Sequence, residues 1–250
     1  MYNIWGMTDI GLVRNENQDA YAIQVCKESG HVICVVCDGM GGPTGGQLAS
    51  TLAVDTFLSS CQGNLVQNMN AEEIRNVAEF AVSTANSAVY ARSREDEEHH
   101  GMGTTLVSAI VWDNKALINN VGDSRAYLIR SEEETDCIHR ITKDHSVVEK
   151  LVEMGNITEE EARTHPDRNL ITRALGPDPD TLSDAYLVDL RRGDYLLLCT
   201  DGLIGTVTDE EMAHEVLCCN DKNNCLNRLL ELSKSRGAAD NVTAVLLQMQ

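Results

Sequence analysis

The sequence predicts an α+β domain in which antiparallel sheets carry helices on their outer sides. Short apolar runs bounded by Gly, Asp or Asn indicate strands, and two long helical segments follow the first of them. The order is strands, two helices, a run of strands, an irregular stretch, a strand, two helices and a final strand. It lacks the regular alternation of a parallel α/β sheet and is typical of a layered α+β domain. We expect one domain over residues 1–250, since a chain of this length can bury a substantial core.

The strands are predicted from composition. Four runs are apolar throughout, which predicts burial on both faces. These runs are Val32–Cys37, Thr105–Val111, Tyr195–Cys199 and Val242–Leu247. Further segments, with hairpin-like spacing through the middle of the chain, also predict strands: Ala116–Val121, Arg125–Ile129 and Ala185–Leu190.

Two long helices are predicted after the first strands. Gly46–Cys61 is apolar on much of its circumference, and Ala71–Arg94 carries an apolar stripe that runs from Ile74 to Val89. Such a stripe is typical of an amphipathic helix that lies on a core. Near the end of the chain, two more segments predict a second helical pair: Asp209–Leu217 and Lys222–Ser235.

Residues 145–175 interrupt the strand pattern. They are polar, and Pro166 lies within them. Thr158 and Glu161 have the spacing of a capping box, which predicts a short helix there. We interpret the stretch as a subdomain inserted over the surface of the same domain.

Charge and hydropathy exclude several kinds of partner. The chain has 39 acidic and 20 basic residues, a formal net charge of −19, so its surface repels nucleic acid and anionic lipid. No run approaches the 18 apolar residues of a transmembrane helix. The first residues lack the basic and apolar regions of a secretory signal. We expect a cytoplasmic protein with no nucleic-acid or membrane partner.

Nine cysteines stand at irregular spacings. Cys34 and Cys37 form a C-x-x-C, but residues three apart on a strand point to opposite faces and cannot easily share a metal or a disulfide. No other cysteines have the spacing of a zinc site. We interpret most of them as small buried hydrophobic residues in a reducing compartment, with redox sensitivity as the alternative.

Aspartates follow or precede the most buried strands. Asp38 and Asp201 each come directly after an apolar run, Asp123 comes two residues after Val121, and Asp240 stands just before the last strand. One Asp-Gly pair is explained as a turn. Four such carboxylates would repel each other and be desolvated unless cations neutralised them. Oxygen ligands suit Mg²⁺ or Mn²⁺, and a glycine after the aspartate lets a carbonyl approach the metal.

The glycine-rich stretch from Asp38 to Gly46 is not a nucleotide-binding loop. It lacks the lysine of a P-loop and the acidic residue that accompanies a dinucleotide motif. It predicts a sharp turn from a strand into a helix. Arg14 lies in a polar stretch beside Asp19, where it can pair with a carboxylate or grip a phosphoryl group with its planar fork.

The ordered motifs resemble those of the protein phosphatase 2C family, the metal-dependent phosphatases, especially its compact bacterial members. The resemblance runs from near residue 8 to the last strand. Its motifs are Gly11-Leu-Val-Arg-x-x-Asn-Gln-Asp19, Asp38-Gly-Met-Gly-Gly42, Gly103-Thr-Thr105, Val121-Gly-Asp-Ser-Arg-Ala-Tyr127, Thr142-Lys-Asp-His145, Ile171-Thr-Arg-Ala-Leu-Gly176, Cys199-Thr-Asp-Gly-Leu203 and Asp240-Asn-Val-Thr243.

This resemblance implies a four-layer α-β-β-α fold, a central antiparallel β-sandwich flanked by helix pairs. It implies that Asp38 bridges two Mn²⁺ or Mg²⁺ ions, and that the Gly39 carbonyl binds one of them. Asp201 and Asp240 would complete the other site. By the same resemblance Asp123 matches the ligand of a weaker third ion, Asp19 an acid that holds waters on the metals, and Arg14 the phosphate-binding arginine. Residues of about 146–170 correspond to a mobile flap.

The implied activity is hydrolysis of phosphoserine and phosphothreonine in proteins. Two bridged cations lower the pKa of a shared water, so no cysteine has to act as a nucleophile. The implied partners are phosphorylated proteins and a serine/threonine kinase that acts on them, and a monomer is the expected state.

Some positions depart from relatives. Met40 stands where many eukaryotic members have a histidine proposed to protonate the leaving alcohol, and Gln18 and Gln47 stand where relatives often have glutamate. Two alternatives remain open: a catalytically weak phosphatase-like binding module, and a metallohydrolase of small phosphoesters.

Overall fold

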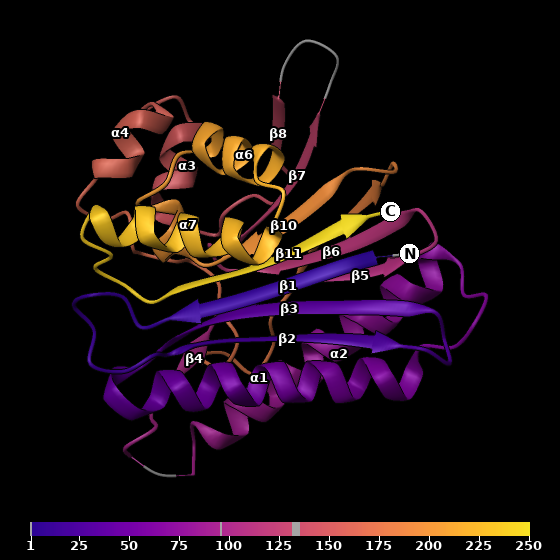
Figure 1. Cartoon of the computed structure of the whole chain (residues 1–250). Coiled ribbons are helices and arrows are strands. Elements are labelled where there is room, and N and C mark those ends of the chain that lie inside the picture. The colour runs from indigo at the N-terminus through magenta and orange to yellow at the C-terminus, as the bar shows by residue number, and fades with distance from the viewer. Residues whose placement is uncertain (1, 96, 132–135) are drawn as a thin grey trace.

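Two antiparallel sheets form the centre of the molecule (Figure 1). One has the strand order β1-β11-β10-β7-β8 and the other β2-β3-β5-β6-β9, with β4 paired to the end of β3. The chain is described by a computed structural model over residues 2–95, 97–131 and 136–250. The strands are β1 (Tyr2–Asp9), β2 (Asp19–Cys26), β3 (His31–Met40), β4 (Gly103–Thr104), β5 (Leu106–Trp112), β6 (Lys115–Val121), β7 (Arg125–Ser131), β8 (Asp136–Arg140), β9 (Asp184–Asp189), β10 (Tyr195–Cys199) and β11 (Val242–Met249).

Helices cover the outer face of each sheet (Figure 1). Two long helices pack on the six-stranded sheet, and a later pair packs on the five-stranded sheet. Three shorter helices lie near one end of the strands. The helices are α1 (Gly42–Asn64), α2 (Ala71–Arg92), α3 (Val147–Glu153), α4 (Glu159–Thr164), α5 (Asp201–Ile204), α6 (Asp209–Cys218) and α7 (Lys222–Ser235).

Strand β3 shows why its central run, Val32–Cys37, is apolar throughout. Val32 and Cys34 contribute to the core between the two sheets. Ile33 and Cys37 point to the opposite face and pack under α1 and α2. Each side chain is buried on one face or the other, and burying an aliphatic side chain of this size contributes about 1.5–3 kcal/mol. Cys34 and Cys37 thus lie in different cores, as their spacing predicts.

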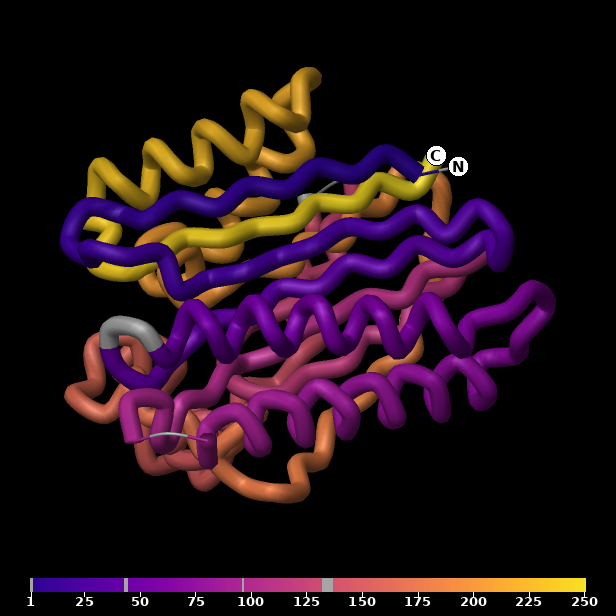
Figure 2. Tube along the Cα trace, turned by 90° about the horizontal axis from the view of Figure 1, so that it is seen from below, coloured from indigo at the N-terminus to yellow at the C-terminus, as the bar shows by residue number. Residues whose placement is uncertain are grey.

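The two ends of the described chain lie side by side (Figure 2). Strand β1 pairs with β11 along its full length, with Tyr2 opposite Met249. The five-stranded sheet therefore combines the first and last strands, and residues near position 10 come close to residues near position 240. This pairing brings Arg14 toward Asp240, which a local pattern in the sequence does not indicate.

The predicted α+β fold with two antiparallel sheets is confirmed. The four apolar runs are strands β3, β5, β10 and β11, buried over most of their length. The first long helix begins at Gly42, not at Gly46, and the second ends at Arg92, not at Arg94. The hairpin-like spacing holds for β5 and β6, whereas β6 and β7 belong to different sheets.

The stretch that interrupts the strand pattern contains α3 and α4. Thr158 and Glu161 form the predicted capping box at the start of α4. Helix α3 is absent from the sequence-based expectation because only Val148 of its residues is buried, which leaves a weak apolar pattern. Among the described residues, no helix has the length and apolar character needed to cross a membrane.

Candidate metal centre

The strand ends bring the predicted aspartates to one end of the sheets. In the six-stranded sheet, Asp19 at the start of β2 lies opposite Asp38 near the end of β3. In the five-stranded sheet, β10 ends next to the starts of β7 and β11. Asp201 follows β10, Asp240 precedes β11, and Asp123 lies between β6 and β7. Antiparallel pairing thus gathers carboxylates from five distant segments.

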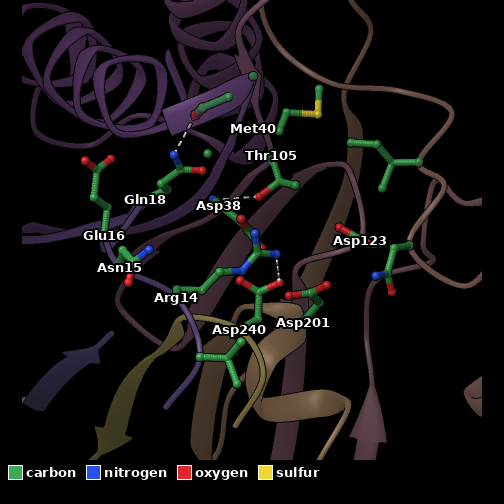
Figure 3. A pocket seen from close by; sticks show the side chains of 16 residues that line it. Arg14, Asn15, Glu16, Gln18, Asp38, Met40, Thr105, Asp123, Asp201 and Asp240 are labelled. Carbon is green, nitrogen blue, oxygen red and sulfur yellow. Dashed lines mark hydrogen bonds and ion pairs between the residues drawn. The ribbon is translucent and has the colours of Figure 1, made fainter. Parts of the chain in front are cut away.

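These residues surround one cavity of about 640 Å³. Arg14, Asp38, Asp123, Asp201 and Asp240 line it, and Figure 3 shows the four carboxylates and the guanidinium gathered in it. The main chain of Gly39 lines it as well. Asp19 is not among the lining residues: it is buried behind them, 8% exposed. The structure therefore brings together all seven residues predicted for the site.

Burial and mutual repulsion raise the pKa values of four of these acids, Asp19, Asp38, Asp123 and Asp201. Burial raises the pKa of Asp19 to about 7, and the charges of Asp201 and Asp240 add to the effect. A hydrogen bond from the Thr200 hydroxyl, 2.9 Å from Oδ2 of Asp19, works against it. The pKa of Asp38 is raised well above its ordinary value by burial and then by the neighbouring aspartates. Carboxylates in such surroundings are stable in the ionised form only when positive charge lies beside them.

The pKa values of Asp123 and Asp201 are raised by the same two causes. Burial is the larger one for both, followed by the charge of Asp201 on Asp123 and of Asp240 on Asp201. Asp123 stands just before β7 and Asp201 just after β10, and these two strands are neighbours in the five-stranded sheet, so the repulsion acts between segments that are far apart in the sequence. The negative charge is therefore a property of the assembled fold.

Arg14 supplies the cation nearest to this cluster. Its Nη2 donates to Oδ2 of Asp240 at 2.6 Å (Figure 3). The hydrogen bond to Asp240 raises the pKa of Arg14, with further contributions from the charges of Asp38 and Asp201. Its side chain is 52% exposed. The interpretation that Arg14 pairs with a carboxylate is therefore correct. Because Arg14 also lines the cavity, its position is compatible with binding a phosphate group there.

The donor set fits a hard divalent cation. Oδ1 of Asp19 and Oδ1 of Asp201 are buried and have no hydrogen-bond partner within the described part of the chain. Among residues 2–95, 97–131 and 136–250, no three His, Cys, Asp or Glu side chains stand together as a complete cation site. Oxygen donors that need positive charge are what Mg²⁺ and Mn²⁺ bind.

Hydroxyl and amide side chains hold the backbone of the site. Oγ1 of Thr105 accepts from the Asp38 main-chain N–H at 2.9 Å (Figure 3) and lies 2.7 Å from Oγ of Ser124. Oδ1 of Asn241 accepts from the Gln18 N–H at 2.8 Å, and its Nδ2 donates to the carbonyl of Ile10 at 2.9 Å. Strand ends from both sheets are therefore tied to each other by side chains whose roles no spacing in the sequence indicates.

The cavity is also lined by residues to which the sequence analysis assigned no role in the metal site. Asn169 and Ile171, at the end of the inserted stretch, line it, as do Asn15 and Glu16. Met40 lines it too, and no histidine is among the lining residues of the described chain. Asn169 follows a polar segment without periodicity, so only the three-dimensional path of the chain places it here.

The chelator-treated protein should lose stability as pH rises. Because burial raises the folded pKa of Asp19 to about 7, the folded state binds more protons than the unfolded state between about pH 4 and pH 7, so unfolding becomes easier across that window. We expect the unfolding temperature of Asp19→Asn, minus that of the wild type, to increase as pH rises from 4 to 7. Thermal melts in EDTA measure it.

Asp19→Asn isolates this effect from opposing ones. Desolvation lowers the pKa values of His31 and His145, which makes their contributions to stability rise with pH. These contributions are common to both proteins and cancel in the difference. A difference that stays constant or shrinks from pH 4 to pH 7 would contradict the electrostatic description of the cluster.

Comparison with known proteins agrees with this geometry. The model of the protein phosphatase 2C family matches residues 13–245. The serine/threonine phosphatase stp of Listeria innocua is 33% identical over 241 residues, which are 96% of this chain and 93% of that protein. The crystal structure of the serine/threonine phosphatase Stp1 from Staphylococcus aureus has a TM-score of 0.92 and 36% identity, covering 100% of this chain and 96% of that one.

A further solved structure contains metal. The catalytic domain of the serine/threonine protein phosphatase PstP, in complex with two manganese ions, has a TM-score of 0.83 and 32% identity. The alignment covers 99% of this chain and 97% of that chain. Sequence, fold and the gathering of the predicted carboxylates agree over nearly the whole length. The chain belongs to the protein phosphatase 2C family.

Proposed function

We propose that Asp38, Asp201 and Asp240, with the Gly39 carbonyl, hold two Mn²⁺ or Mg²⁺ ions for the dephosphorylation of proteins. The chain is a metal-dependent protein serine/threonine phosphatase. The observation that carries the assignment is the cluster of acids at one cavity, in which Asp19, Asp38, Asp123 and Asp201 have raised pKa values. Asp123 would contribute to the site of a weaker third ion, and Asp19, behind the cavity, would accept hydrogen bonds from water molecules of the site.

The cations supply the chemistry that the side chains lack. When bound, two such ions lower the pKa of a water molecule and neutralise the charge of the phosphoryl oxygens. The two manganese ions of the similar PstP domain support this number and this metal. Buried aspartate oxygens without a partner support it from within the chain.

Arg14 positions the phosphoryl group. Its pKa is raised, so it stays charged, and one of its N–H groups is used on Asp240. A guanidinium carries five N–H donors, which leaves others for phosphoryl oxygens. The bond to Asp240 limits the orientations of the side chain before the substrate arrives, which favours in-line attack. Met40 lines the cavity and, within the described part of the chain, no histidine does, so we assign protonation of the leaving alcohol to solvent.

The frame for this site is a four-layer α-β-β-α domain, supported by three hydrophobic cores between successive layers. We assign substrate choice to the flap, residues 146–170, because Asn169 and Ile171 at its end line the cavity. The partners are phosphorylated proteins and a serine/threonine kinase, and the acting form is a monomer. Nine cysteines outside disulfide bonds support a reducing, cytoplasmic setting.

Metal removal tests the proposed function. Treatment with EDTA should abolish hydrolysis of a phosphothreonine peptide, and Mn²⁺ or Mg²⁺ should restore it, because without the cations no water is activated and the aspartates repel the phosphate dianion. Phosphate release is measured with the peptide and, in parallel, with a nucleoside monophosphate. Activity that survives EDTA would overturn the metal assignment. A nucleoside monophosphate hydrolysed as well as the peptide would favour a general phosphoesterase.

A further inference from the structure

His145 binds both main-chain groups of the residue that precedes Asp123. The Gly122 N–H donates to Nδ1 of His145 at 3.0 Å, and the His145 N–H donates to the Gly122 carbonyl at 2.9 Å. His145 is 6% exposed and is not among the residues that line the cavity. It therefore reaches the site through Gly122 and not by contact with substrate.

The peptide at Gly122 has little freedom to move. Its φ is +107°, and a Cβ at this position would lie 2.6 Å from Cγ2 of Thr105. Thr105 in turn accepts from the Asp38 N–H. The carbonyl of Gly122 also accepts from Nδ2 of Asn120 at 3.3 Å. The main chain before Asp123 is thus packed on one side against the support of Asp38 and held on the other by His145.

A carboxylate fixes the tautomer of His145. Its Nε2 lies 3.2 Å from Oδ2 of Asp184 on β9, and Oδ1 of Asp184 accepts from Arg173 at 2.8 Å. Burial raises the pKa of Asp184, but the hydrogen bonds from Arg173 and His145 outweigh it and hold the pKa below its ordinary value, so Asp184 is ionised and accepts. Nε2 must then carry the proton, which leaves Nδ1 free to accept from Gly122.

The same residue joins the two ends of the flap. The Thr172 N–H donates to the His145 carbonyl at 2.7 Å, and Ser146 pairs with Ile171 in an isolated bridge. Both ends of the flap are therefore held beside His145, which in turn binds Gly122 next to Asp123.

We propose that His145, oriented by Asp184, is a positioning residue that sets the affinity of the weak cation site at Asp123. This inference rests on the proposed function, in which Asp123 is a metal ligand. The alternative is a buried histidine that only packs. Partners that orient metal ligands typically contribute about 10- to 100-fold in metal affinity or activity, so the two roles differ measurably.

The test uses a pair of amides that separate the two ring nitrogens. In His145→Asn the amide oxygen takes the place of Nδ1 and keeps the acceptor for Gly122, whereas in His145→Gln the amide nitrogen takes the place of Nε2 and keeps Asp184. Both variants lose the packing of the imidazole ring to a similar extent, and thermal melts check that their stabilities are alike. Mn²⁺ binding to the chelator-treated full chain is followed by the electron paramagnetic resonance signal of free Mn²⁺.

We expect the weakest Mn²⁺ equivalent to lose about tenfold in affinity in His145→Gln and to stay near wild type in His145→Asn, with the tighter ions unchanged in both. Asp184→Asn, which weakens the tautomer lock and leaves the ring in place, should give an intermediate loss. Equal affinities in all three variants and the wild type, or equal losses in the Asn and Gln variants, overturn the role of His145.

Asp123→Asn separates this inference from the one on which it rests. If Asp123→Asn weakens the last Mn²⁺ equivalent and His145→Gln does not, only the role of His145 fails. If Asp123→Asn binds Mn²⁺ as the wild type does, the ligand assignment of Asp123 itself fails.

Discussion

Asp38→Asn should abolish phosphopeptide hydrolysis while leaving the fold intact. The charges of all four other acids of the cluster act on Asp38, and the Asn amide replaces a charged oxygen with a neutral donor. The loss expected is on the order of 10³-fold or more in kcat, since electrostatic stabilisation of the phosphoryl group and the activated water both depend on the cations it would hold. Phosphate release at saturating Mn²⁺ measures it.

Asp38→Asn should have the opposite effect on stability: activity is lost, but the metal-free fold is not destabilised. Burial and repulsion raise the pKa of Asp38, so its charge destabilises the metal-free fold at neutral pH. The variant should melt no earlier than the wild type in EDTA, and Mn²⁺ should raise its midpoint less than that of the wild type. Asp55→Asn, an exposed acid on α1, is the matched control and should keep full activity. Near-normal activity in Asp38→Asn would remove this residue from the site.

The sequence predicts the carboxylates of the site because their signal is local. An apolar run that ends in Asp38, and another that ends in Asp201, indicate where buried strands stop and which side chains stand there. The alternation of β3 between two cores explains why such a run has no polar member before Asp38. Local patterns therefore suffice to name the acids and the layered α+β class.

Contacts between distant segments are beyond such patterns. The pairing of Arg14 with Asp240 joins residues 226 positions apart and follows from the pairing of the first and last strands. Asn241 ties Gln18 to the same region by side-chain hydrogen bonds. A single sequence shows which groups can donate and accept, but the partner is chosen by the folded path of the chain.

Position 39 needs a glycine for a second physical reason, which the sequence does not reveal. The sequence suggests that glycine there lets its carbonyl approach a metal. In the structure, a Cβ on Gly39 would lie 2.0 Å from the Gly46 carbonyl oxygen and 2.7 Å from that of Gln18. Both are main-chain atoms of the start of α1 and of the segment before β2, so neither can rotate away. The missing side chain is what allows these segments to meet beside Asp38.

Gly39→Ala should therefore destabilise the fold and disable the site together. Overpacking in a tight interior costs about 1–3 kcal/mol, and a shift of about 1 Å at a reacting group can cost on the order of 10²-fold in rate. Gly63→Ala is the control, because a Cβ there meets nothing within 4 Å and alanine in a helix is favoured by up to about 1 kcal/mol. In thermal melts Gly39→Ala should unfold at a lower temperature than the wild type, and Gly63→Ala at the same or a higher temperature. In phosphopeptide kinetics only Gly39→Ala should lose activity. If Gly39→Ala keeps both wild-type stability and wild-type kcat, then α1 and the segment before β2 can separate without moving Asp38, and the close approach is not what positions the cluster.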